Sequence, residues 1–169
     1  MQRVILFLFI VAYNFTGYTQ DIKGTETTTI YFIRHAEKDR SNPNDRNPAL
    51  TQDGLGRAVK WAEVLKNQKL DAVYSTDYNR TKQTAAPSAA KNGLEVTLYD
   101  PRNFNPNTLK ELKEKTILVV GHSNTTPAMV NTILGSKKYQ QIDDSNNGNL
   151  YVVTIQNGTV VNSTLLYIN

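Results

Sequence analysis

The chain has 169 residues, of which 39% are hydrophobic and 20% charged, a balance that fits one soluble globular domain and excludes a disordered or membrane-embedded chain. Its formal charge of +4 is not gathered into any block of Lys and Arg, which favours a small anionic ligand over a nucleic acid. Cysteine is absent, so a cysteine nucleophile, a disulfide and a thiolate zinc site are all excluded.

The N-terminus has the pattern of an export signal. Arg3 precedes an apolar run of about ten residues, and a polar stretch follows it. A bilayer span needs about twenty apolar residues, so this run is too short to stay in a membrane. Loss of Arg3 lowers the formal charge from +4 to +3, because residues 1–20 hold no acid. A buried first strand or helix is the alternative. We expect a signal peptide over 1–20, a short tether over 21–27 and one folded domain over 28–169.

Apolar runs then alternate with helical patterns, as they do in an α/β sheet. Residues 28–33 form a run without polar alternation, which is typical of a central strand covered on both faces. A short strand is expected at 72–74. Between them a helix should begin at Asp53. Its expected buried face consists of Leu55, Ala58, Val59, Ala62 and Leu65.

A second helix should run from about Asn79 to Asn92 and end at Gly93, with Pro87 kinking or dividing it. A third strand is expected at 95–99. The capping box Thr108-x-x-Glu111 predicts a short helix that begins there.

Residues 117–120 predict a second fully buried strand. Asn124 or Thr125 can cap the following helix, which Gly135 should end, and the polar stretch 136–149 predicts a surface loop. Asn157-Gly158 predicts a hairpin between strands at 151–155 and 159–168. Together the elements predict a three-layer α/β/α sandwich, with a mostly parallel central sheet and an antiparallel C-terminal hairpin.

Both histidines of the chain directly follow a predicted central strand: His35 follows residues 30–33 and His122 follows 117–121. In open parallel sheets ligands bind outside the carboxyl ends of the strands. Either histidine alone is adequately explained as a hydrogen-bonded residue at a strand end. Two in equivalent positions indicate a site.

The sequence resembles the histidine phosphatase superfamily, which includes the cofactor-dependent phosphoglycerate mutases, through four ordered motifs. These are Arg34-His35-Ala36-Glu37, Leu50-Thr51-Gln-Asp-Gly54, Tyr74-Ser75-Thr-Asp-Tyr-Asn-Arg80-Thr-Lys-Gln83-Thr84-Ala85 and Val120-Gly121-His122-Ser123. Ala36 stands where the family motif has glycine, and Arg57 takes the place of a frequent glutamine. The chain leaves little length between its strands for a lid, so the resemblance is to a small branch without one.

The resemblance implies that His35 is a nucleophile that forms a phosphohistidine. A neutral imidazole can attack phosphorus near pH 7 without a separate base. Arg34 and Arg80 offer planar charged forks that suit phosphate oxygens, and His122 as an imidazolium would add a further donor. A solvated helix arginine is the alternative for Arg80, but the first turn of a helix also favours an anion.

Proton transfer to the leaving oxygen calls for a carboxylic acid. Many family members have a Glu after the third strand, and Asp100 is the candidate at that place here, although an Asp before Pro also simply starts a turn. Glu37 is the rival acid. Lys38 precedes the polar loop 39–48 and Arg46 lies within it. We expect this loop to form the mouth of the site, with Lys38 and Arg46 as the residues that contact substrate.

No cofactor or metal is expected. Two histidines far apart in sequence and no cysteine are a poor start for a zinc site, and the nucleotide-binding glycine motifs are missing. The expected partner is a small phosphorylated substrate, with no nucleic acid and no membrane span after processing, while the oligomeric state stays open.

We therefore expect an exported phosphomonoesterase. A non-catalytic phosphate-binding module and a phosphohistidine protein phosphatase are the alternatives. Sequons at Asn79 and Asn124 adjoin Arg80 and His122, and glycans there would block the pocket. A bacterial periplasm or exterior is thus expected over a eukaryotic secretory route.

Overall fold

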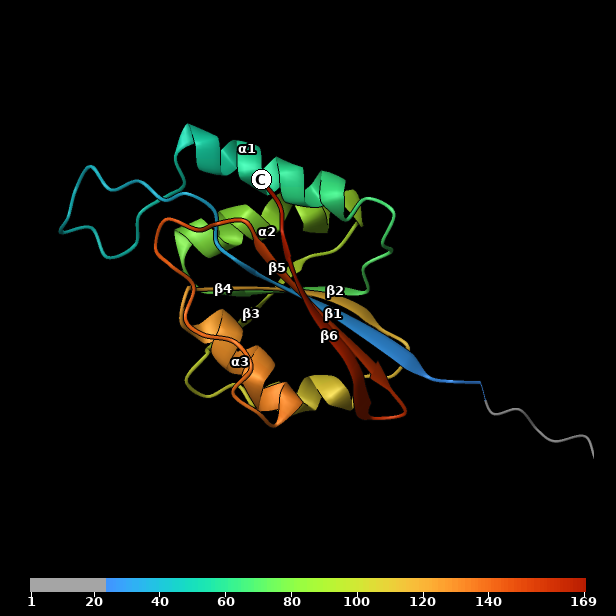
Figure 1. The fold of residues 1–169 in the computed structure, drawn as a ribbon. Coiled ribbons are helices and arrows are strands. Elements are labelled where there is room, and N and C mark those ends of the chain that lie inside the picture. Colours follow the sequence, from blue (N-terminus) through green and yellow to red (C-terminus); the bar gives the residue numbers. More distant parts are fainter. Residues whose placement is uncertain (1–23) are drawn as a thin grey trace, which may run out of the picture.

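The computed structural model describes residues 24–169, so the expected signal peptide lies outside the described part. A six-stranded sheet forms the centre of the molecule (Figure 1). In chain order the elements are β1 (Thr27–Arg34), α1 (Gln52–Val64), β2 (Ala72–Thr76), α2 (Asn79–Lys91), β3 (Val96–Tyr99), the 3₁₀ helix η1 (Pro106–Lys110), β4 (Thr116–Gly121), α3 (Thr125–Leu134), β5 (Asn149–Gln156) and β6 (Thr159–Tyr167).

The strands lie in the order β3-β2-β4-β1-β5-β6. The first four are parallel to one another, while β5 pairs antiparallel with β1 and β6 antiparallel with β5. Asn157 and Gly158 both have positive φ, 50° and 78°, as a tight turn between twisted strands requires. The expected mostly parallel sheet with a C-terminal hairpin is confirmed.

Helices cover both faces of the sheet, with α1 and α2 on one side and α3 and η1 on the other (Figure 1). Ile33 of β1 packs in one core with Trp61, and Phe32 packs in the opposite core with Ile133. All four side chains are at most 1% exposed, and burial of each contributes about 1.5–3 kcal/mol. Burial on both faces explains why the sequence of β1 shows no polar alternation.

The expected buried face of α1 was partly wrong. Leu55 and Val59 are 40% and 56% exposed, whereas Gly54 and Trp61 face the core. The helix packs so closely at Gly54 that a Cβ there would lie 2.2 Å from the Glu37 carbonyl oxygen. The close approach at this glycine therefore sets which face turns inward.

Pro87 lies inside one continuous α2, so it does not divide the helix, and a kink there stays a prediction. One other local expectation differs from the structure. The capping box at Thr108 does not open a helix, because Asn105 caps the 3₁₀ helix by accepting a hydrogen bond from the backbone N–H of Asn107. Within residues 24–169 no helix has the length and apolar character that a membrane crossing requires.

Gly54 and Gly56, on the same helix, should respond in opposite directions to replacement by alanine. Gly54→Ala is expected to lower the free energy of unfolding by about 2–4 kcal/mol, because its Cβ meets the Glu37 backbone. A Cβ at Gly56 would have no atom within 4 Å, so Gly56→Ala should raise the free energy of unfolding by about 0.5–1 kcal/mol through helix propensity. Urea unfolding measures both, and equal effects would contradict the close packing.

Candidate active site

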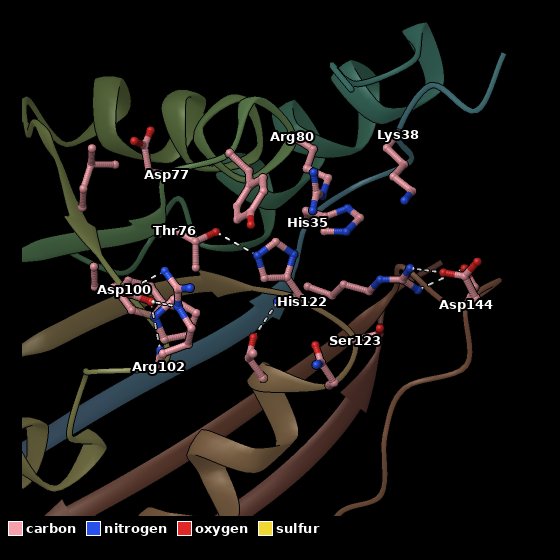
Figure 2. A pocket seen from close by; sticks show the side chains of 17 residues that line it. His35, Lys38, Thr76, Asp77, Arg80, Asp100, Arg102, His122, Ser123 and Asp144 are labelled. Carbon is pink, nitrogen blue, oxygen red and sulfur yellow. Dashed lines mark hydrogen bonds and ion pairs between the residues drawn. The ribbon is translucent and has the colours of Figure 1, made fainter. Parts of the chain in front are cut away.

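A cleft of about 770 Å³ lies at the carboxyl ends of the parallel strands (Figure 2). Most of the residues that the sequence singled out line it. They are Arg34, His35, Lys38, Arg80, Asp100 and His122. Arg46 is exposed on the loop before α1 and is not among the lining residues, so its contact with substrate stays a prediction.

The two histidines face each other across the cleft, with ring centroids 5.5 Å apart. His35 Nδ1 lies 2.8 Å from the Ala36 carbonyl oxygen, and a carbonyl can only accept, so we assign the proton to Nδ1. That tautomer leaves the lone pair of His35 on Nε2. His122 Nε2 lies 3.0 Å from the Thr76 hydroxyl (Figure 2).

Both imidazoles are neutral at neutral pH. Burial, and then the charges of Arg34, His122 and Arg80, lower the pKa of His35 to about 3, against a smaller rise from the Ala36 carbonyl. Burial, and then Arg80, Arg34 and Lys38, lower the pKa of His122 to about 4. The expected imidazolium at His122 therefore requires an anion in the cleft, whose charge would raise that pKa.

These depressed pKa values predict acid-sensitive stability. Below the unfolded pKa of about 6.5, the unfolded chain binds protons that the folded chain does not, so stability falls as the pH drops toward the folded values. Between pH 7 and pH 5 each histidine should cost about 2 kcal/mol of unfolding free energy. Urea unfolding at the two pH values measures this loss. His35→Asn should remove about half of it, and an unchanged pH dependence would contradict the assignment.

Arg34 is 2% exposed, and main-chain oxygens hold most of its guanidinium. Nη1 donates to the carbonyls of Asp143, Asp144 and Asn146 at 2.9, 3.0 and 3.0 Å. Nη2 donates to the Asp144 carboxylate at 2.6 Å. Nε is buried and has no partner among the described residues. The stretch 136–149 is largely the expected surface loop, and carbonyls of residues 143, 144 and 146 within it also bind Arg34.

Arg80 occupies the second position of α2 and stacks on an aromatic ring that the sequence did not single out. Its Cζ lies 4.4 Å from the ring centroid of Tyr78, which also contacts His122 edge-on at 5.2 Å. The Thr84 hydroxyl donates to the Arg80 carbonyl and accepts from the Ala36 N–H, so it joins α2 to the first motif. Arg80 Nε and Nη1 are buried without a partner in the described chain.

Residues of the Leu50–Gly54 motif, together with Gln83, hold the backbone next to the site through hydrogen bonds. Thr51 caps α1 by accepting from the N–H of Gly54, and its own N–H donates to the Glu37 carbonyl. Gln83 accepts from the N–H of Leu50. The Leu-Thr-x-x-Gly element thus positions the chain after His35 and makes no part of the cleft wall.

Each acid that the sequence offered as proton donor is ion-paired. Asp100 lines the cleft, but it accepts from Arg102 at 3.1 Å, and this pairing lowers its pKa, so it is a carboxylate at neutral pH. Figure 2 shows the Asp100–Arg102 pair on the far side of His122 from His35. Glu37 pairs with Arg57 at 2.7 Å and does not line this cleft. Arg57, which takes the place of a frequent family glutamine, therefore pairs with Glu37 and does not line the cleft.

Among residues 24–169 no group of three or more His, Asp or Glu side chains could hold a metal ion. The chemistry available in the cleft is that of two neutral imidazoles beside two buried guanidinium groups. Three of the guanidinium nitrogens have no acceptor among residues 24–169: Nε of Arg34, and Nε and Nη1 of Arg80. Buried donors normally have partners, so this arrangement suits a bound oxyanion.

The profile of the histidine phosphatase superfamily (branch 1) matches residues 30–101, the stretch with His35 and Arg80. This match and the fold agree with the resemblance of the four sequence motifs to the histidine phosphatase superfamily. No curated protein is similar enough in sequence to match this chain.

Solved structures of several phosphatases share the fold. The protein histidine phosphatase SixA in complex with tungstate aligns with a TM-score of 0.65 and 18% identity, over 82% of this chain and 94% of its own. Phosphoserine phosphatase from Entamoeba histolytica, in complex with 3-phosphoglyceric acid, aligns with a TM-score of 0.61 and 17% identity, over 81% of this chain and 96% of its own. A mycobacterial glucosyl-3-phosphoglycerate phosphatase aligns with a TM-score of 0.61 and 14% identity, over 85% of this chain and 99% of its own.

Proposed function

We propose that this chain is a histidine phosphatase and hydrolyses phosphomonoesters through a phosphohistidine on His35. The observation that carries the proposal is a set of three buried guanidinium nitrogens that have no partner in the described part of the chain, beside a neutral His35. Such donors meet the negative charge that spreads over the equatorial oxygens during phosphoryl transfer. The free Nε2 lone pair of His35 supplies the nucleophile.

Two displacements complete the reaction. In the first, His35 Nε2 forms a bond to phosphorus, the bond from phosphorus to the ester oxygen breaks, and that oxygen takes up a proton. In the second, water attacks the phosphohistidine and loses a proton, the N–P bond breaks, and inorganic phosphate leaves with His35 restored. Arg34, Arg80 and His122 would hold the phosphoryl oxygens through both steps.

Asp100 stays the candidate for proton transfer. As a carboxylate it can accept the proton of the attacking water directly. Donation to the leaving oxygen in the first step requires Asp100 to bind a proton beforehand, against its pairing with Arg102. Leaving groups that depart without strong protonation, such as phenols, suit this cleft best.

The paired acids also support a second candidate, a phosphate-binding module without turnover. Asp77, Asp100 and Asp144 line the cleft and pair with Lys82, Arg102 and Arg34, respectively. A phosphohistidine protein phosphatase is the third candidate. It is favoured by the similarity to SixA, while export would separate the protein from cytosolic phosphoproteins.

The N-terminal pattern supports export to a bacterial periplasm or exterior. Mass spectrometry of the protein recovered from cell fractions tests this part of the proposal. Recovery of a chain that begins near Asp21 outside the cytoplasm is expected, and intact Met1 in the cytoplasm would contradict it.

Trapping of the phosphoenzyme tests the activity. Purified protein is mixed with a ³²P-labelled aryl phosphate and quenched, and label that is stable in base but lost in acid is the expected result. Binding of inorganic phosphate without any label or turnover, across a broad panel of phosphoesters, would identify the phosphate-binding module instead.

A further inference from the structure

We propose that Asp144 is a positioning residue, which holds the Arg34 guanidinium with its Nε edge toward the phosphoryl group. Asp144 belongs to the segment 142–148, here named the clamp segment. The inference rests on the proposed function, because it assigns a role in phosphate binding to a residue that the reaction itself does not use.

The clamp segment binds Arg34 on the side away from Nε. Three carbonyls of the segment accept from Nη1, and the Asp144 carboxylate accepts from Nη2. A guanidinium carries five N–H groups in one plane. These contacts use both N–H groups of Nη1 and one of Nη2. The N–H of Nε and the second one of Nη2 remain, and a pair on neighbouring nitrogens is the fork that binds two oxygens of a phosphate.

The segment is itself fixed at both ends and touches the nucleophile. The N–H of Ile142 donates to the Ser123 carbonyl, next to His122, and the N–H of Ile168 donates to the Gly148 carbonyl. Gly148 has no room for a Cβ, which would lie 2.5 Å from the Ile168 carbonyl oxygen. Asn147, 8% exposed, donates from Nδ2 to the His35 carbonyl at 2.8 Å.

Asp144 differs from the carbonyls because it brings a negative charge. Carbonyl oxygens accept from the buried Arg34, but within the described residues only Asp144 forms an ion pair with it, at 2.6 Å. An unpaired buried cation is unfavourable, so without Asp144 the side chain gains by turning toward solvent. The other Asp144 oxygen accepts from Arg40 at 2.7 Å, and the Asp144 side chain is 67% exposed. A change at Asp144 should therefore spare the fold.

The test compares Asp144→Asn with two controls in steady-state hydrolysis of p-nitrophenyl phosphate. Asp144→Asn is expected to lower kcat/KM by about 10- to 100-fold with little change in thermal midpoint, and Asp144→Glu should restore part of the loss. Arg40→Ala removes the other partner of Asp144, and Asp39→Asn removes the same charge from a carboxylate that accepts from the Ser41 N–H. Both should stay within about twofold of wild type. A loss in Arg40→Ala equal to that in Asp144→Asn would overturn the proposal.

A double-mutant cycle separates positioning of Arg34 from a general effect of the loop. In an Arg34→Ala background, Asp144→Asn should cost less than about twofold, because its target is gone. A full additional loss there would overturn the proposal.

Phosphate binding keeps the test informative if the wild-type protein shows no turnover, an outcome that would count against the proposed function alone. Inorganic phosphate is titrated while the imidazole NMR signals of the two histidines are followed. Asp144→Asn is expected to weaken phosphate binding about tenfold and Arg40→Ala to leave it unchanged. Equal phosphate affinity in wild type and Asp144→Asn would reject the positioning role whatever the turnover.

Discussion

His35→Ala is expected to lower kcat/KM for an aryl phosphate by about 10⁴-fold or more and to abolish the acid-labile phosphoenzyme. The loss follows from the geometry, because Nδ1 of His35 is engaged by the Ala36 carbonyl and only Nε2 can attack. His122 cannot substitute, because its Nε2 contacts the Thr76 hydroxyl and its ring centroid lies 5.5 Å from that of His35. Steady-state hydrolysis measures the loss of kcat/KM, and ³²P trapping measures the loss of the phosphoenzyme.

The matched control is His122→Ala in the same assays. It removes a donor and leaves the nucleophile, so it should lower kcat/KM by about 10²–10³-fold and still give a slowly formed phosphoenzyme. Inorganic phosphate should bind to both variants through the two arginines. Residual label in His35→Ala, at the wild-type amount, would place the phosphoryl group on another residue.

Arg80→Lys is expected to lower kcat/KM by about 10²-fold although it keeps the charge. Two guanidinium nitrogens of Arg80, Nε and Nη1, are buried and have no partner among residues 24–169. A lysine ammonium has no such rigid, planar set of donors. Lysine also loses the flat stacking of the guanidinium on Tyr78. The loss should appear in both kcat and the inhibition constant of inorganic phosphate, which steady-state kinetics measures.

Arg57→Lys serves as the control for this substitution. Arg57 is an arginine of the neighbouring helix α1 that pairs with Glu37 outside the cleft, so its change should cost less than about threefold. Similar losses in Arg80→Lys and Arg57→Lys would mean that Arg80 acts through the stability of the helices and not through phosphate.

Patterns local in sequence predicted much of the fold. The runs at 28–33 and 117–120, which lack polar alternation, identified the two central strands, because a strand buried on both faces has no polar face. Asn157-Gly158 identified the hairpin, because few residue pairs accept positive φ twice. Helix faces and caps were predicted less well. The inward face of α1 depends on how closely Gly54 approaches the Glu37 backbone, a contact between separate elements.

The candidate site was predicted from the same kind of evidence. His35 and His122 follow parallel strands that lie side by side, so their meeting needed only the sheet topology. Tyr78 and Thr76 were not singled out, although both lie within four residues of Arg80. Nothing near Arg34 in sequence shows its partners, which lie 109 or more residues later.

The sequence by itself determined the chemistry of the cleft: which side chains can carry a phosphoryl group or bind its oxygens, and at which strand ends they stand. The tertiary structure alone decided the state of those groups. Burial lowers the pKa of both histidines, Arg102 lowers the pKa of Asp100, and the clamp segment binds Nη1 and Nη2 of Arg34. Strand ends follow from local apolar patterns. Protonation and hydrogen-bond partners depend on what the fold packs around a side chain, and a linear sequence does not contain that information.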